Sequence, residues 1–218
     1  MSTNVILTVA LCVGLSGAAL AQSPHTHTHT FDDAQKWAKV FDDPKRDAWQ
    51  KPHEVLAALA LKPDAVVADV GAGTGYFTVR LALRLPNGRV YAIDTEPQMV
   101  KHLASRAREA GLKNVTAVVG TPDDPRIPAR ADVVLFVDVY HHIEKRERYF
   151  ANLATALKPG GRVAIVDFRM DAPQGPPRSA RIEPDRVKAE LRTAGYELAR
   201  EHAFLPYQYF LEFVPAKR

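Results

Sequence analysis

Cysteine is nearly absent from this sequence, since Cys12 is the single one among 218 residues. One cysteine cannot form an internal disulfide, and it cannot build the four-cysteine or mixed cysteine–histidine ligand sets of structural zinc sites. The sequence therefore excludes a disulfide-stabilised scaffold and a cysteine-based metal protein.

Charged residues are absent from residues 1–21. Val5–Leu20 is mostly apolar or small, and Ala19-Leu20-Ala21 has the A-x-A form of a signal-peptidase site. We therefore predict a signal peptide over residues 1–21 and an exported, periplasmic or secreted chain that begins at Gln22 and keeps no membrane span. Since no Lys or Arg precedes the apolar stretch, a membrane anchor and a cytoplasmic protein with a false signal are the alternatives.

Long basic runs are absent too. The formal net charge is +4, with 46% hydrophobic and 25% charged residues, an ordinary balance for one globular domain. Because Lys and Arg are scattered instead of gathered in one patch, no nucleic acid partner is indicated. The sequence does not indicate an oligomeric state.

Residues 22–52 differ in composition from the rest and are predicted to be a tail and an N-terminal arm. His25, His27 and His29 alternate with Thr, which is the pattern of a linker or of a small metal-binding tail; we favour the linker. The arm carries Trp37, Phe41 and Trp49, and the folded domain is expected over residues 53–218. No metal site is predicted in that domain.

The strongest motif is Val67–Thr78, V-A-D-V-G-A-G-T-G-Y-F-T. An apolar run ends at Asp69, three glycines alternate, and a helical pattern follows at once, which predicts a strand, a tight loop and a helix N-terminus. Glycine is required where the backbone takes positive φ or lies close to a ligand. The loop is therefore expected to hold a nucleoside-like ligand.

The glycine spacing separates the possible ligands. A dinucleotide fingerprint reads G-x-G-x-x-G, whereas this loop reads G-x-G-x-G and has Tyr76 at the third dinucleotide position. No G-K-[ST] follows, which excludes a P-loop. A nicotinamide-dependent oxidoreductase is thus disfavoured.

Strand and helix patterns alternate through the chain, which is typical of a parallel sheet with crossover helices. We predict helices at 53–61, 76–85, 97–110, 145–157 and 184–194, strands at 66–70, 89–94, 115–119, 131–137, 162–167, 196–202 and 207–214, and a turn at 158–161.

Acidic residues end or follow the predicted strands, at the edge of the sheet where α/β proteins bind ligands. These candidate binding residues are Asp69, Asp94, Asp123, Asp124 and Asp138. A single strand-end aspartate is often a helix cap, but a repeated set is better explained by one ligand.

The string D-V-G-A-G-T-G, together with L-K-P-G-G-R-V-A-I-V-D at Leu157–Asp167, resembles the S-adenosylmethionine (SAM) dependent methyltransferases with a Rossmann-like sheet. The resemblance covers Val66 to about Val214 and implies a seven-stranded, mostly parallel α/β sheet with helices on both faces and an antiparallel C-terminal edge hairpin. It also implies that SAM is the cofactor and that a small molecule accepts the methyl group.

Carried over by position, the resemblance assigns a part of the SAM molecule to each candidate. Gly71 and Gly73 would lie under the methionine and ribose, Asp69 would face the amino end, and Asp94 would hold the ribose hydroxyls. Asp124, beside Asp123, would meet the adenine, and Asp138 would lie near the methyl donor. Neighbouring residues complete the cofactor set: Ala72, Gly75 and Thr95.

His141, His142 and Tyr140 follow the fourth strand and are the catalytic candidates, because an acceptor hydroxyl or acidic carbon must lose a proton to a base. Trp49 and His53 are expected either to close over the site or simply to pack on the surface.

Without Cys12 the mature chain would have no thiol for cysteine-mediated arsenic methylation. A non-catalytic, exported nucleoside- or metabolite-binding protein is the alternative function.

Overall fold

The computed structural model describes residues 33–217, so the predicted signal peptide and histidine tail lie outside the described residues. Within this range the chain forms a seven-stranded sheet of order β3-β2-β1-β4-β5-β7-β6. The strands are β1 (Val66–Val70), β2 (Arg89–Asp94), β3 (Val115–Val119), β4 (Ala131–Val137), β5 (Leu157–Phe168), β6 (Tyr196–His202) and β7 (Gln208–Pro215). β1 to β5 are parallel, while β7 runs antiparallel to β5 and pairs with β6 as a hairpin. The predicted fold is confirmed.

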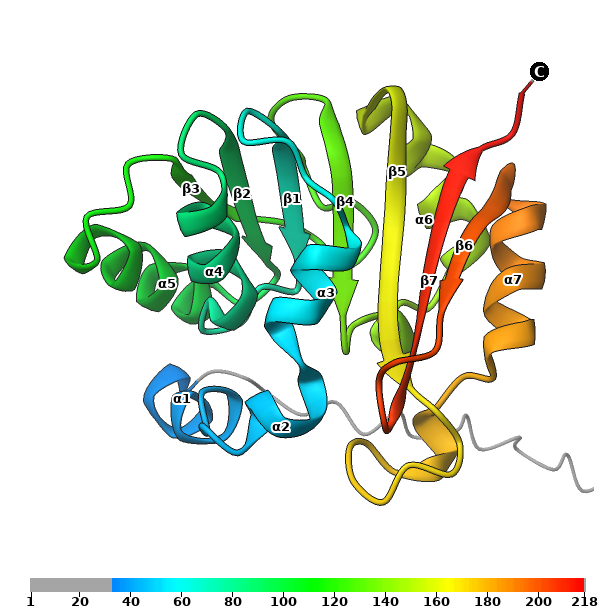
Figure 1. Cartoon of the computed structure of the whole chain (residues 1–218), viewed down its shortest axis with the longest axis horizontal. Helices are drawn as coiled ribbons and strands as arrows, with labels where there is room; N and C mark the ends of the chain where they lie inside the picture. The colour runs from blue at the N-terminus through cyan, green and yellow to red at the C-terminus, as the bar shows by residue number, and fades with distance from the viewer. Residues whose placement is uncertain (1–32, 218) are drawn as a thin grey trace, which may run out of the picture.

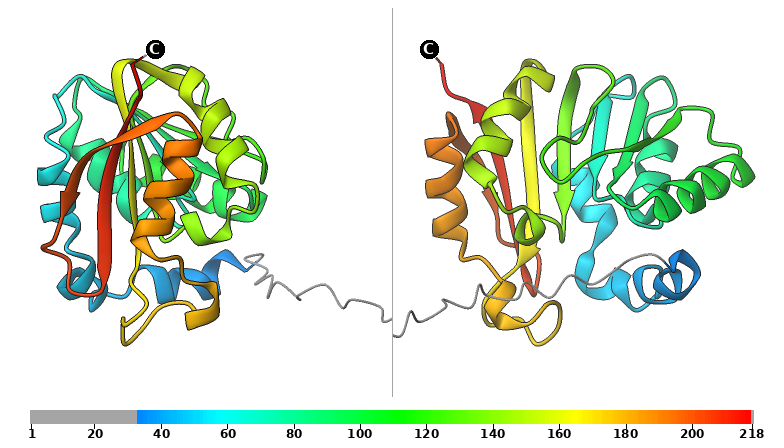
Figure 2. Two further views of the ribbon diagram at one scale, coloured as in Figure 1. Left: turned by 90° about the vertical axis from the view of Figure 1, so that its right-hand side faces the viewer. Right: turned by 180° about the vertical axis from the view of Figure 1, so that it is seen from behind.

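Helices cover both faces of the sheet, because alternate strand residues point to opposite sides. α3 (Pro52–Ala58), α4 (Tyr76–Arg84) and α5 (Pro97–Glu109) lie on one face, where Leu81 packs with Val133 and Leu135. α6 (Arg146–Leu153) and α7 (Pro184–Thr193) lie on the other, where Phe150 packs with Phe136. Figure 2 shows these two helical layers on either side of the sheet.

The predicted turn at 158–161 is wrong in its placement. β5 already begins at Leu157, and its pairing with β4 shifts between Ala131 and Val133, which is an irregularity of bulge type. Lys158 Nζ lies 2.7 Å from Asp132 Oδ2 and ties this stretch to β4. The helix predicted over 145–157 accordingly ends at Leu153, and a 3-10 turn (Ala154–Ala156) leads into β5.

The N-terminal arm contains two helices that the sequence did not reveal, α1 (Ala34–Phe41) and α2 (Arg46–Gln50). Asp33 caps α1 by accepting a hydrogen bond from the backbone N–H of Lys36 at 3.0 Å. Figure 1 shows both helices below the arrowheads of β1 and β4. The arm therefore lies at the edge of the sheet where the acidic strand ends gather. Across residues 33–217, no helix combines the length and apolarity that a membrane crossing requires.

Candidate functional site at the strand ends

The glycine loop between β1 and α4 has a left-handed backbone that favours glycine. Gly71, Gly73 and Gly75 have φ values of 71°, 54° and 92°. A Cβ added to Gly71 would lie 2.2 Å from Cγ2 of Val139. Because both neighbouring N–H groups, of Gly71 and Ala72, donate to the carbonyl of Ile93 at 2.8 and 2.9 Å, the loop is held firmly against β2.

Asp94 at the end of β2 is bonded directly to this loop. Its Oδ2 accepts the backbone N–H of Gly73 at 2.8 Å, and its Oδ1 accepts that of Glu96 at 3.0 Å. Burial raises the pKa of Asp94, although hydrogen bonds from the Glu96, Gly73 and Thr95 backbones oppose the rise. The structure thus places a half-buried carboxylate against the glycine loop, with Thr95 exposed next to it.

Asp69 lies beneath the loop and already has a partner. Thr78 Oγ1 donates to its Oδ2 at 2.6 Å, and the Asp69 side chain is buried. Burial raises the pKa of Asp69 to about 6 despite this hydrogen bond. The contact joins the end of β1 to the first turn of α4, so that Asp69 supports the loop from below.

Asp138 follows β4 and is contacted by both the arm and the C-terminal hairpin. Its φ is +60°, Arg46 Nη2 lies 3.2 Å from its Oδ2, and Gln208 Nε2 donates to its Oδ1. Burial raises the pKa of Asp138 to about 7, against the lowering effect of Arg46. The arm therefore reaches into the strand-end site, which we define as the carboxyl ends of β1, β2, β4 and β5 with the glycine loop.

The raised pKa values of two aspartates at the strand-end site predict that the stability of the fold depends on pH. Asp138 and Asp69 have pKa values of about 7 and 6 against an ordinary value of 3.8. Between about pH 4 and pH 7 the folded chain binds protons that the unfolded chain has lost, so the free energy of unfolding is expected to fall as pH rises. In Asp138→Asn the decrease in unfolding free energy across this window should be smaller than in the wild type by at most about 4 kcal/mol, because one pKa unit corresponds to about 1.4 kcal/mol.

Urea unfolding of the ligand-free protein at several pH values in this window measures the effect. The matched control is Asp132→Asn: burial raises the pKa of that carboxyl, but the hydrogen bonds from Lys158 and from the Val66 backbone outweigh burial and hold the pKa below its ordinary value. A wild-type stability that rises steadily through the window would contradict the prediction.

The three catalytic candidates lie in a 3-10 turn (Tyr140–His142) but point to different places. Tyr140 is fully buried, and its hydroxyl donates to Glu190 Oε2 on α7 at 2.6 Å. Its candidacy as a catalytic residue is therefore corrected: the phenol is in the core. His142 is exposed, and its ring centroid lies 4.1 Å from that of His141.

His141 is the candidate that the structure places at the strand-end site. Its Nδ1 lies 2.9 Å from Oδ2 of Asp167, the penultimate residue of β5, which sequence reasoning did not single out. Asp167 could have been predicted from the sequence, because it lies at the end of a predicted strand like the other candidate acids. Arg46, Gln50 and Gln208 were also missed, and no local pattern marks them.

Asp123 and Asp124 follow β3 and are exposed. Their loop joins β2 through a hydrogen bond from Gly120 N–H to Asp94 O at 3.0 Å, and Asp124 Oδ1 accepts the Arg126 N–H at 2.7 Å. The side chain of Asp123 lies 4.0 Å from Lys145 Nζ. The structure thus puts the two acids on the β3 side of Asp94.

Arm contacts cover the glycine loop. Arg106 bonds to Asp42 at 2.8 Å and to the Thr74 carbonyl at 2.9 Å, and Phe41 lies 3.4 Å from the position of a Cβ on Gly73. Trp49 packs on Phe168 and Tyr207, with ring centroids 5.5 and 6.4 Å away. His53 is exposed on α3 and makes none of these contacts.

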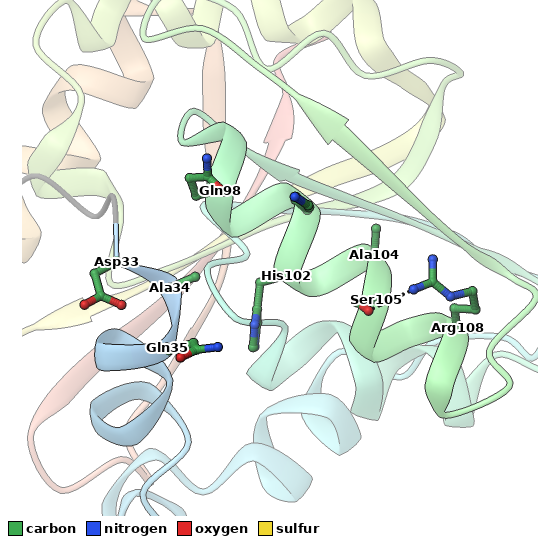
Figure 3. A pocket seen from close by; sticks show the side chains of 9 residues that line it. Asp33, Ala34, Gln35, Gln98, His102, Ala104, Ser105 and Arg108 are labelled. Carbon is green, nitrogen blue, oxygen red and sulfur yellow. Dashed lines mark hydrogen bonds between the residues drawn. The ribbon is translucent and has the colours of Figure 1, made fainter.

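A separate cavity of about 670 Å³ lies between α1 and α5. Figure 3 shows Gln35 and His102 projecting toward each other from these two helices. Its lining contains no predicted site residue: Asp33, Ala34, Gln35, Gln98, Lys101, His102, Ala104, Ser105 and Arg108. The cavity is thus distinct from the strand-end site.

Comparison with known proteins identifies the core of the chain. Residues 67–161 match a family described as "Methyltransferase domain". This central part of the chain is thus similar to a methyltransferase domain. A solved SAM-dependent methyltransferase from Aquifex aeolicus is 27% identical, covers 83% of this chain and 97% of its own, and superposes with a TM-score of 0.76.

Curated relatives agree on methyl transfer but differ in acceptor. The chain is similar to an arsenite methyltransferase of Halobacterium salinarum, 28% identical over 65% of this chain and 39% of the relative. It is also similar to a trans-aconitate 2-methyltransferase of Rhodopseudomonas palustris, 30% identical over 61% of this chain and 48% of the relative. The chain spans about half the length of the curated relatives it matches, or less.

S-adenosylmethionine is the cofactor indicated by the Aquifex aeolicus neighbour, which is a SAM-dependent methyltransferase. Another structural neighbour, a magnesium protoporphyrin IX methyltransferase of 20% identity, was solved with bound S-adenosylhomocysteine (SAH). The residues present fit it. Thr74 Oγ1 in the glycine loop is buried and finds no hydrogen-bond partner among the described residues. This unpaired hydroxyl is accounted for when a polar ligand lies against the loop. Among residues 33–217 no cluster of His, Cys, Asp or Glu is arranged to hold a metal ion.

Proposed function

We propose that this protein is a methyltransferase that uses SAM to methylate a small-molecule acceptor. The supporting observation is the hydrogen bond between Asp94 and Gly73 at 2.8 Å, which brings the predicted ribose acid and the predicted SAM loop into one site. When bound, SAM supplies a methyl group already activated by a sulfonium. The remaining task of the protein is to orient the acceptor and to remove its proton.

The names of the relatives do not indicate one acceptor: they are an arsenite methyltransferase, a trans-aconitate 2-methyltransferase and a ubiquinone/menaquinone biosynthesis C-methyltransferase. Cys12 is the only cysteine in the sequence, so a thiol-based arsenic chemistry has little support in this chain. The acids of the strand-end site favour a neutral or cationic acceptor over an anionic one.

Isothermal calorimetry with SAM and SAH tests the proposal directly. We expect both to bind, whereas NAD and ATP, which the glycine spacing disfavours, should not compete. Release of SAH in the presence of an acceptor would then demonstrate transfer. Absence of SAM and SAH binding at millimolar concentration would overturn the proposed function.

We also propose that the protein is exported, on the strength of the uncharged, apolar residues 1–21 and the Ala19-Leu20-Ala21 site. Mass analysis of the native protein is expected to show an N-terminus at Gln22. Replacement of Ala21 by a bulky charged residue, Ala21→Arg, should block this processing. An intact N-terminus on the wild-type protein, recovered from the cytoplasm, would contradict export.

A further inference from the structure

His141 and Asp167 form a buried pair at the carboxyl ends of β4 and β5. Nδ1 of His141 lies 3.0 and 2.9 Å from Oδ1 and Oδ2 of Asp167, and the His141 backbone N–H donates to the same Oδ2 at 3.1 Å. The two side chains are only 5% and 3% exposed. Phe168 N–H donates to Asp167 Oδ1 at 2.8 Å. The carboxylate is thus fixed on several sides, and it fixes the orientation of the ring.

This contact also determines which ring nitrogen is basic. A carboxylate accepts the Nδ1 proton, so the lone pair of neutral His141 is on Nε2. Among the described residues no hydrogen bond to Nε2 is found, in contrast to His202, whose Nε2 is paired with Glu212 at 2.7 Å. His141 Nε2 therefore keeps its lone pair unpaired by any described residue.

Charged and titratable groups face His141 from several elements. Burial lowers the pKa of His141, but the hydrogen bond and charge of Asp167, together with the charge of Asp138, raise it overall. Asp138 is itself paired with Arg46 of the arm at 3.2 Å, and His142 lies against the ring. From β7, Tyr209 pairs in register with Asp167, and its buried hydroxyl has no partner among the described residues.

The surroundings of the pair are aromatic. Phe168 follows Asp167 directly, and Trp49 of the arm packs on Phe168 with ring centroids 5.5 Å apart. Tyr207 completes this cluster at 6.4 Å from Trp49. A flat aromatic acceptor would find apolar surface here, whereas a carboxylate would meet Asp138 and Asp167 and, being ionised at neutral pH, would need no base.

We propose that Asp167 is a positioning residue that holds His141 as the base for an acceptor bearing a neutral aromatic hydroxyl; this inference rests on the proposed function. The hydroxyl proton passes to Nε2 of His141 while the acceptor oxygen bonds to the methyl carbon. The electron pair of the broken carbon–sulfur bond stays on sulfur. The products are a methyl ether, a neutral thioether and an imidazolium, which returns its proton to water.

The first test needs no acceptor. 15N NMR of the SAH complex reports the protonation of each histidine ring, and the His141 signals are those that disappear in His141→Gln. In the wild type we expect His141 to be the Nδ1-protonated tautomer and to have a pKa above that of ordinary histidine. Asp167→Asn should lower this pKa and shift the tautomer, while SAH affinity stays within about threefold because Asp167 is not a cofactor contact. Glu212→Gln is the control, since it loosens the other histidine–carboxylate pair, and it should leave the His141 signals unchanged.

An Asp167→Asn protein with unaltered His141 tautomer and titration would overturn the positioning role, whereas failure of the wild type to bind SAH would overturn the proposed function instead. The two failures are therefore distinguishable. If Asp167→Asn does not fold, the direct comparison of His141 with His202 in the wild type still decides, because a His141 protonated only on Nε2 contradicts the geometry.

The second test uses phenols of graded acidity as acceptors, with SAH release as the readout at neutral pH. Wild type is expected to methylate phenols whose pKa lies near 10, the ordinary tyrosine value. Asp167→Asn and His141→Gln should lower kcat for these phenols by about 10²- to 10⁴-fold with little change in KM. Nitrophenols, which are already ionised, should recover most of the lost rate. Equal losses for both kinds of phenol, or no phenol turnover by a wild type that binds SAM, would overturn the proposal.

Discussion

Asp94→Ala is expected to weaken SAM and SAH binding by about 10²-fold or more. A hydrogen bond to a charged group contributes about 1.5–3 kcal/mol, and a ribose offers two hydroxyls to this carboxylate. Its removal therefore costs about 3 kcal/mol or more, and each 1.4 kcal/mol is about tenfold in affinity. The substitution also frees the backbone N–H groups of Gly73 and Glu96, which the carboxylate now orients.

Calorimetric titration of the purified variant with SAH measures this loss. Asp132→Ala is a suitable control, because Asp132 likewise accepts a backbone N–H, from Val66 at 2.7 Å, but lies at the opposite end of β4. We expect its affinity for SAH to equal that of wild type. A tenfold or smaller loss in Asp94→Ala would show that the ribose is held elsewhere.

Gly71→Ala is expected to abolish cofactor binding and to destabilise the fold by about 3 kcal/mol. Two effects combine: left-handed backbone costs a residue with a side chain about 1–2 kcal/mol, and the new methyl group meets Val139, whose Cγ2 would lie only 2.2 Å away. Relief of the overlap moves either the loop or the segment that carries Asp138, and overpacking of this kind costs about 1–3 kcal/mol.

Gly111→Ala separates the two effects. Gly111 has a φ of +68°, close to the +71° of Gly71, but a Cβ there meets nothing within 4 Å. Its unfolding free energy should fall by about 1 kcal/mol, the backbone cost alone, with SAH affinity unchanged. Equal unfolding free energies of the two variants in urea titrations would mean that the Val139 side chain moves aside without a free-energy cost.

The sequence predicted the parts of this protein that depend on local pattern. β1, β2, β3 and β4 begin and end where alternation and turn residues place them, and the glycine loop is where its spacing indicates. These features depend on neighbouring residues, whose influence can be read in a short window. The domain boundaries proposed at residues 21 and 52 stay predictions.

What the sequence did not reveal depends on contacts between distant residues. Arg46 pairs with Asp138, which is 92 positions away in the sequence, and nothing in the composition of the arm predicts that pairing. Tyr140 and His141 are adjacent in sequence, yet the 3-10 turn sends one side chain into the core and the other to Asp167. The hydrophobic periodicity and the residue spacing predict the same role for both neighbours. Only tertiary packing determines which side chain is in the core and which is at the site.

The anchoring of the arm has a consequence for the order in which the chain folds. Gln50 is buried and donates to Gln208, 158 residues further along the chain, and Gln208 in turn holds Asp138. Contacts of such long sequence separation form late, since the cost of closing the loop must be met first. During synthesis on the ribosome, the arm has no Gln208 to dock on until the last strand emerges. We therefore expect nascent chains that stop before β7 to leave the arm open to added protease.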